Sequence, residues 1–213
     1  YDPNRTFFAQ FDELLKKVPL MNLYGLYTTV ENSEYTNMVS HIKNCYMTTY
    51  CDFSENLTYG SFVNNSKDSV DNSMMNGCEL CYETVNCRNC YKTLFSVDCD
   101  DCLEISFSKN CVGCQNCFGC ANLRKKNYHI WNKPVSKEEY EKFLVKEFPR
   151  TAQDIRDTYE KAENFWLQFP VKYMHGSHNA NVSGEYLYDS KNSHYCYIGG
   201  QLEDCKFCSH ITP

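Results

Sequence analysis

Cysteine is the residue type in this chain whose spacing could support chemistry. Among its 15 cysteines, Cys78 and Cys81 form one Cys-x-x-Cys motif, and Cys99 and Cys102 form another 21 residues later. Zinc in structural sites takes four ligands, with Zn–S distances of about 2.3 Å for thiolates. If the two motifs stack on each other, they bring four thiolates together. The spacing therefore predicts a zinc site at Cys78, Cys81, Cys99 and Cys102.

A second run of cysteines offers a weaker metal site. Cys111, Cys114, Cys117 and Cys120 follow one another at intervals of three residues. This spacing resembles that of iron–sulfur ligands, but Ala121 stands where those motifs have a proline. We therefore treat the run as an alternative zinc set rather than as a cluster site.

Two other interpretations of the cysteines remain open. Free cysteine behaves as a small buried apolar residue, and the hydroxyl residues Ser66, Ser69, Thr93 and Ser108 stand at equivalent positions. Because a ligand position does not alternate with serine, these substitutions favour an interior ladder of thiols. Disulfides between turns about 4.8 Å apart are geometrically permitted, but the odd cysteine count argues against a full framework.

The elements that position these cysteines are predicted from their long-range spacing. One series comprises Ser33, Leu57, Cys78, Cys99 and Cys120; the other comprises Cys45, Ser69, Cys90 and Cys111, each twelve residues after its counterpart. From Leu57 onward both series recur every twenty-one residues, and such a fixed period is typical of a solenoid. We expect a mainly β fold: a β-solenoid with turns of about 21 residues and two strands per turn.

The rest of the chain divides around this repeat. We expect an N-terminal helical cap over residues 1–29, with a helix over 5–17, and solenoid repeats over 30–123. Residues 124–172 form a strand and two helices, the first opened by a capping box from Ser136 to Glu139. Residues 173–213 continue the solenoid. The first and last residues suggest a fragment of a longer protein.

Charge and hydropathy restrict the partners. The formal net charge of -6 argues against nucleic-acid binding over most of the surface. Arg124, Lys125, Lys126 and Lys133 form the local exception and would carry an alternative nucleic-acid contact. No apolar run approaches the ~20 residues of a membrane helix, and no signal-peptide pattern is present. We expect a cytoplasmic protein, with a surface or extracellular location as the alternative.

Two stretches resemble a known family. Residues 1–11, from Tyr1-Asp2-Pro3-Asn4-Arg5 to Phe11, and residues 116–123, Asn-Cys-Phe-Gly-Cys-Ala-Asn-Leu, are similar to cysteine-rich, repeat-containing hypothetical proteins of candidate-phyla bacteria. His129 occupies a position where that family is expected to have cysteine. The resemblance implies no activity.

Together these observations predict a scaffold rather than an enzyme. The chain offers a long regular surface, and the sequence shows no phosphate-binding loop, HExxH motif or nucleophile elbow. We expect a non-enzymatic β-solenoid scaffold or protein-interaction module that binds a protein partner or itself. The alternative is a zinc-stabilised module associated with nucleic acid or the ribosome.

Overall fold

A computed structural model describes residues 1–19 and 23–211, and the chain falls into two compact units, 1–169 and 170–213. Residues 20–22 of the expected cap and 212–213 of the expected continuation lie outside the described part. The first unit contains α1 (Phe7–Lys17), a 3-10 turn (Tyr27–Thr29), β1 (Val30–Glu31), β2 (Asn37–Lys43), β3 (Thr49–Thr58), β4 (Ser61–Asn64), β5 (Lys67–Val70), β6 (Ser73–Asn76), β7 (Tyr91–Leu94), β8 (Leu103–Ser106), β9 (Gln115–Phe118), β10 (Asn127–Ile130), β11 (Lys133–Pro134), α2 (Lys137–Glu147) and α3 (Ala152–Trp166). The second contains β12 (Gly176–Ser177), β13 (Gly184–Tyr188), β14 (Cys196–Gly200) and β15 (Ser209–Ile211).

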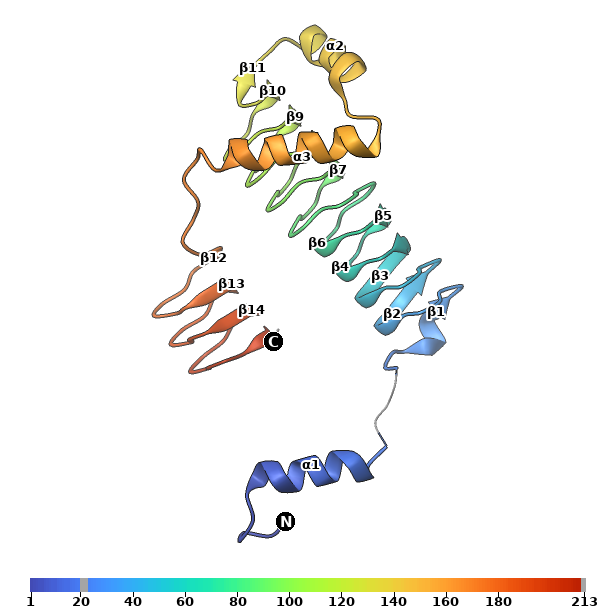
Figure 1. Ribbon diagram of the computed structural model, residues 1–213, viewed down its shortest axis with the longest axis vertical. Helices are drawn as coiled ribbons and strands as arrows, with labels where there is room; N and C mark the ends of the chain where they lie inside the picture. Colours follow the sequence, from blue (N-terminus) through green and yellow to red (C-terminus); the bar gives the residue numbers. More distant parts are fainter. Residues whose placement is uncertain (20–22, 212–213) are drawn as a thin grey trace. The chain divides into compact units, whose positions relative to one another are not determined.

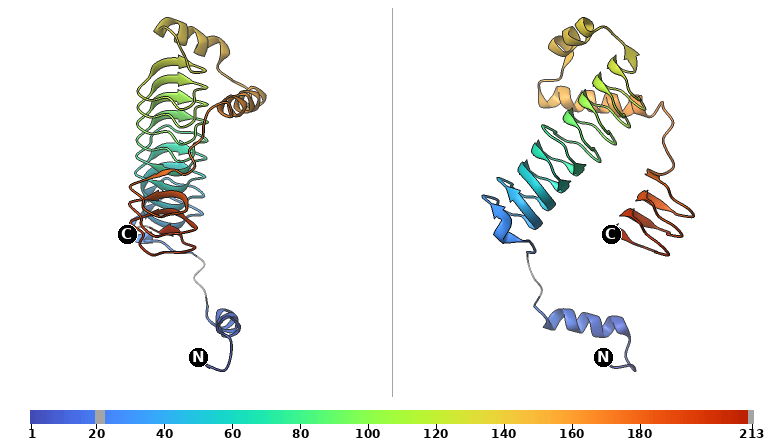
Figure 2. Two further views of the ribbon diagram at one scale, coloured as in Figure 1. Left: turned by 90° about the vertical axis from the view of Figure 1, so that its left-hand side faces the viewer. Right: turned by 180° about the vertical axis from the view of Figure 1, so that it is seen from behind.

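Strands β1 to β10 stack in parallel with partners twelve residues apart (Figures 1 and 2), and β11 pairs antiparallel with β10. Val39 lies opposite Cys51, and Ile105 lies opposite Cys117. Isolated bridges such as Asn76 with Arg88 carry the same register between the named strands. We call each twelve-residue segment a coil. The mainly β, parallel architecture expected from the sequence is confirmed.

The predicted 21-residue turn with two strands is wrong, because the register is twelve residues. Every third residue of the coils points inward, and the core positions Val39, Ile42, Cys45 and Cys51 follow this rule. Each coil therefore has four inward positions. Twenty-one is a multiple of three but not of twelve. A 21-residue step therefore joins two inward residues that do not lie opposite each other in successive coils. The apparent 21-residue period is a multiple of the three-residue spacing between inward positions.

The residue before each inward position has a positive φ. Asparagine and aspartate at Asn44 and Asp68 tolerate this left-handed conformation, but Tyr50, with φ 53°, and Phe53, with φ 50°, adopt it as well. The repeated left-handed residue bends the chain once every three residues. This bend closes a coil in twelve residues.

Two helices follow the last coil. Ser136 and Glu139 form the expected capping box of α2, and Thr151 and Asp154 form a second one at the start of α3. The twelve-residue register continues to Ile130, which pairs with Phe118, so β10 still belongs to the stack. Helix α3 lies alongside the later coils (Figure 1) and buries Ala162 and Trp166 against them.

The second unit is a smaller parallel stack with its own core. Gly176 of β12 pairs with Leu187 at a step of eleven residues, and Gly184 of β13 pairs with Cys196 at a step of twelve. Leu187, Cys196 and Leu202 form the core. No helix within the described residues is long and apolar enough to span a membrane.

Candidate functional site: the cysteine columns and the aromatic face

The twelve-residue register sorts the inward residues of the first unit into four columns. One column holds Cys78, Cys90, Cys102 and Cys114; the next holds Cys51, Cys87, Cys99 and Cys111; a third holds Cys45, Cys81 and Cys117; the fourth ends at Cys120. All twelve side chains are buried and all are free thiols. The columns predicted from the 21-residue period, such as Cys78 with Cys99 and Cys120, are wrong for the reason given above.

The first predicted zinc set is not brought together as one group. Cys78 and Cys102 belong to the same column but are two coils apart, with Cys90 between them. The thiol of Cys78 lies beside those of Cys81 and Cys90, whereas the thiol of Cys99 lies beside that of Cys102. The set therefore divides into two pairs.

The second predicted set lies around a single coil. Cys111, Cys114, Cys117 and Cys120 occupy its four inward positions in turn. Neighbouring thiols of this coil lie beside each other, Cys111 with Cys114, Cys114 with Cys117, and Cys117 with Cys120. No group of three or more His, Cys, Asp or Glu side chains within residues 1–19 and 23–211 has a geometry that could hold a metal ion. Zinc binding stays a prediction.

Sequence reasoning missed the motif that the structure stacks. Cys87 and Cys90, Cys99 and Cys102, and Cys111 and Cys114 are three Cys-x-x-Cys pairs in successive coils. We call these six residues the thiol lattice. Neighbouring thiols interact across a coil, as between Cys99 and Cys102, and between coils, as between Cys99 and Cys111. The twelve-residue steps from Cys78 to Cys90 and from Cys99 to Cys111 are present in the sequence, but 21-residue steps are present as well, and the spacing alone does not choose between them.

Each thiol is also bonded to backbone. Cys90 Sγ donates to the Arg88 carbonyl oxygen at 3.1 Å, and Cys102 Sγ donates to that of Asp100 at 3.2 Å. Serine makes the same bond in the column of Cys90 and Cys102: Ser66 Oγ donates to the Asn64 carbonyl at 2.9 Å. Cysteine and serine can therefore replace each other in this column without leaving a buried donor unpaired.

The surroundings of the thiols shift their pKa values in opposite directions. Cys51 has no thiol hydrogen-bond partner, and burial raises its pKa to about 11. In the lattice, hydrogen bonds from Cys90 and Cys99 lower the pKa of Cys87. Hydrogen bonds to Cys102, Cys78 and Cys87 raise the pKa of Cys90.

One outer side of the coils forms an aromatic face. Its members lie in two adjacent columns: Tyr35, Tyr46, Met47, Tyr59, Val70, Tyr82, Leu94, Phe95, Phe107, Phe118 and Trp131. From Tyr82 onward α2 and α3 cover it, and Phe107 and Phe118 are buried there. From Tyr35 to Val70 it is bare, with Tyr35 72% and Tyr59 50% exposed. We call these parts the covered half and the bare half.

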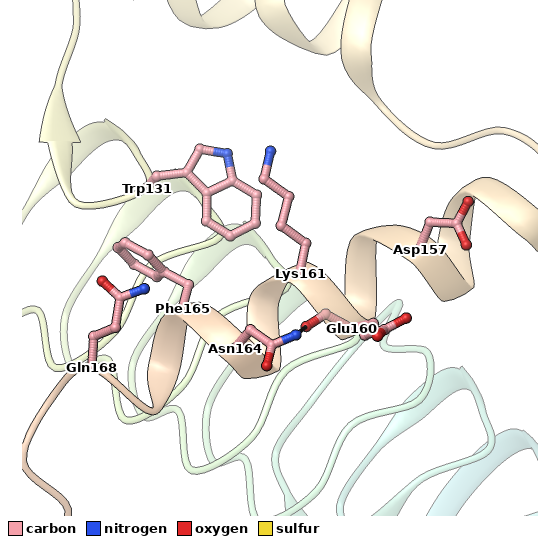
Figure 3. A pocket seen from close by; sticks show the side chains of 7 residues that line it. All are labelled: Trp131, Asp157, Glu160, Lys161, Asn164, Phe165 and Gln168. Carbon is pink, nitrogen blue, oxygen red and sulfur yellow. Dashed lines mark hydrogen bonds between the residues drawn. The ribbon is translucent and has the colours of Figure 1, made fainter.

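A surface pocket of about 560 Å³ lies where α3 meets Trp131 (Figure 3). Lys161 Nζ is 4.7 Å from the centroid of the Trp131 ring, a cation–π contact. Asp157 and Glu160 lie nearer the N-terminal end of α3 and form the acidic end of the pocket. The pocket is open and carries both charge signs, and its residues show no nucleophile paired with a base.

The four basic residues of the nucleic-acid alternative lie near the end of the stack. Arg124 donates to the Asn110 side-chain and backbone oxygens. Lys125 and Lys126 follow it and are exposed, and Lys133 is exposed in β11. Arg124 is therefore partly engaged by the coil below it.

Comparison with known proteins gives no family. No family model and no curated protein matches the chain. A solved structure of a proposed acetyltransferase from Bacillus cereus resembles it with a TM-score of 0.19 and 6% identity, over 62% of this chain and 86% of that one. A hexapeptide transferase family protein from Anaplasma phagocytophilum does so with a TM-score of 0.17 and 12% identity, over 65% and 90%. Neither likeness carries an argument about this chain.

Proposed function

We propose that the protein is a non-enzymatic β-solenoid scaffold whose bare half binds a partner protein. One observation carries the proposal: the same aromatic face is buried by helix α3 over its later coils and left exposed over its earlier ones. Contiguous exposed apolar patches on soluble proteins commonly mark interaction sites.

The covered half indicates what kind of element fits the bare half. Helix α3 lays Ile155, Tyr159 and Trp166 against the face, with Ala162 allowing close approach. An amphipathic helix thus packs on this surface within the chain itself. The bare half continues the same two columns without a break in register, so a second helix can lie on it in the same way.

Charge specifies the partner further. Glu34, Asp71 and Glu83 stand in the two columns of the bare half and at its junction with the covered half, and no Lys or Arg stands there between residues 34 and 83. Complementary charge favours correct partners and speeds association. The fitting occupant is an amphipathic helix of a partner protein, with an apolar stripe flanked by basic residues.

A matched pair of probes tests this assignment. A synthetic helix with a leucine stripe and flanking lysines should bind in a salt-sensitive manner, and its copy with glutamates should bind more weakly. Tyr59→Ser should weaken binding of the lysine helix by about tenfold, the scale of a central interface residue. Phe53→Ser is the control, because Phe53 is 61% exposed but stacks on His41 on another side.

Two outcomes would overturn the proposal. Equal binding of the two helices, or equal loss in the two variants, would show that the bare half is not the site. Dimerisation that Tyr59→Ser abolishes in sedimentation experiments would assign the surface to a second copy of this chain instead of a basic helix.

A further inference from the structure

The thiol lattice has a geometry that selects among metals. The Sγ atoms repeat the same hydrogen bond from coil to coil, donating to the carbonyl two residues earlier. The donor–acceptor distances are 3.6 Å for Cys87, 3.1 Å for Cys90, 3.4 Å for Cys99, 3.2 Å for Cys102, and 3.5 Å for both Cys111 and Cys114. The side chains therefore point the same way in each coil.

The four sulfurs of two equivalent cysteine pairs in successive coils form a parallelogram. Cys99 is related to Cys87, and Cys102 to Cys90, by the same step of one coil, about 4.8 Å along the stack. Four points related in this way lie in one plane. Zinc requires its four ligands at the corners of a tetrahedron, which a planar set does not provide. This agrees with the absence of a metal-holding group of three or more side chains in the described residues.

A planar ladder of thiols suits a different cation. Soft thiolates select Cu(I), and a d10 monovalent ion accepts two ligands in a line or three in a plane. We propose that the thiol lattice binds Cu(I) between neighbouring sulfurs along and across the coils. The central pair, Cys99 and Cys102, would take part in the largest number of sulfur–metal bonds.

The charge and proton balance permits binding in a dry interior. One Cu(I) between two thiols forms two S–Cu bonds and releases two protons to solvent, leaving one negative charge. A second ion on the far side of either sulfur shares that thiolate and reduces the charge per sulfur. Since an isolated buried charge is costly, the lattice should load several ions rather than one.

The lattice offers matched variants, because a serine hydroxyl can donate to the carbonyl two residues earlier as these thiols do, and Ser66 makes that bond to Asn64 at 2.9 Å. Cys99→Ser removes a central sulfur while keeping the bond to the Val97 carbonyl that Cys99 makes at 3.4 Å. Cys51→Ser is the control: Cys51 is 0% exposed and donates to the Thr49 carbonyl at 3.2 Å, but lies outside the lattice. Both substitutions remove one buried thiol.

The test is refolding of the full chain without oxygen in the presence of Cu(I), followed by competition with a chromogenic Cu(I) chelator. The refolded protein should hold at least two Cu(I) ions against the chelator. Cys99→Ser should weaken retention by about tenfold or more, since even loss of an outer-sphere partner costs about 10–100-fold. Cys51→Ser should match the unsubstituted chain, and circular dichroism should show both variants folded.

Three results would overturn the proposal. The first is equal loss in both variants, and the second is retention no stronger than that of the same chain in denaturant. The third is one equivalent of zinc that excludes copper, which would mean that the coils rearrange into a tetrahedral site. If Cys99→Ser fails to fold, Cys111→Ser at the edge of the lattice gives the same comparison with Cys51→Ser.

Discussion

Phe107 stacks on Phe95 with ring centroids 4.7 Å apart and ring planes 15° from parallel. Both rings are buried where α3 lies on the coils, and Phe118 continues the contact at 5.2 Å. Outward-pointing aromatic residues of three successive coils thus form a second core between the stack and the helix. This core joins the helices to the coils.

Replacing Phe107 with alanine should therefore destabilise the first unit strongly. Phe107 is 0% exposed, and removing such a ring costs about 3–5 kcal/mol. Urea denaturation would measure the loss. Phe53→Ala is the comparison, because Phe53 is 61% exposed and should cost less than about 1 kcal/mol. Similar losses in the two variants would show that α3 does not depend on the ring ladder.

The local signals of the helices were readable from the sequence, while the coil length was not. The capping box of Ser136 and Glu139 lies within four residues and depends only on their types. Coil length depends on the left-handed residues, and Tyr50 and Phe53 are not types that suggest a positive φ. The spacing of cysteines alone could not separate twelve residues from twenty-one, because both are multiples of three.

The sequence also could not predict which part of the aromatic face is covered and which is bare. Tyr59 and Phe95 lie in the same column, three coils apart, and both look like strand residues. Phe95 is 4% exposed and Tyr59 50% exposed only because α3 lies on one and not on the other. Which coils a helix covers is a matter of tertiary packing, which no short-range pattern records.

Cys81→Ser should be mild if Cys81 is a core thiol. Ser69, in the same column, donates to the Lys67 carbonyl at 2.7 Å, and a serine at 81 can donate to the Glu79 carbonyl that Cys81 Sγ reaches at 3.4 Å. With its donor satisfied, the variant should lose less than about 1 kcal/mol. Urea denaturation together with elemental analysis would check this. A large loss accompanied by metal release would favour the predicted zinc site instead.

Gly184→Ala should disrupt the second unit and leave the first intact. A Cβ at Gly184 would lie 1.6 Å from the Cys196 carbonyl oxygen, and the residue has a φ of +139°. The substitution cannot be accommodated while β13 pairs with β14. Limited proteolysis should then cleave within residues 170–211 first. Gly200→Ala is the control, since its Cβ would meet its nearest neighbour at 3.8 Å; equal sensitivity of the two variants would contradict this account.

Stability should fall at alkaline pH through the isolated buried thiol of Cys51. Burial raises its pKa from 9.0 to about 11, so the folded state holds the proton more tightly than the unfolded chain does. The resulting stabilisation is fully present below pH 9 and is lost as pH rises towards 11, and a shift of this size corresponds to about 2–3 kcal/mol. Urea denaturation at a series of pH values would measure the loss. Cys51→Ser removes the titrating group and should flatten part of the alkaline slope. An unchanged slope in this variant would place the sensitivity elsewhere among the buried thiols.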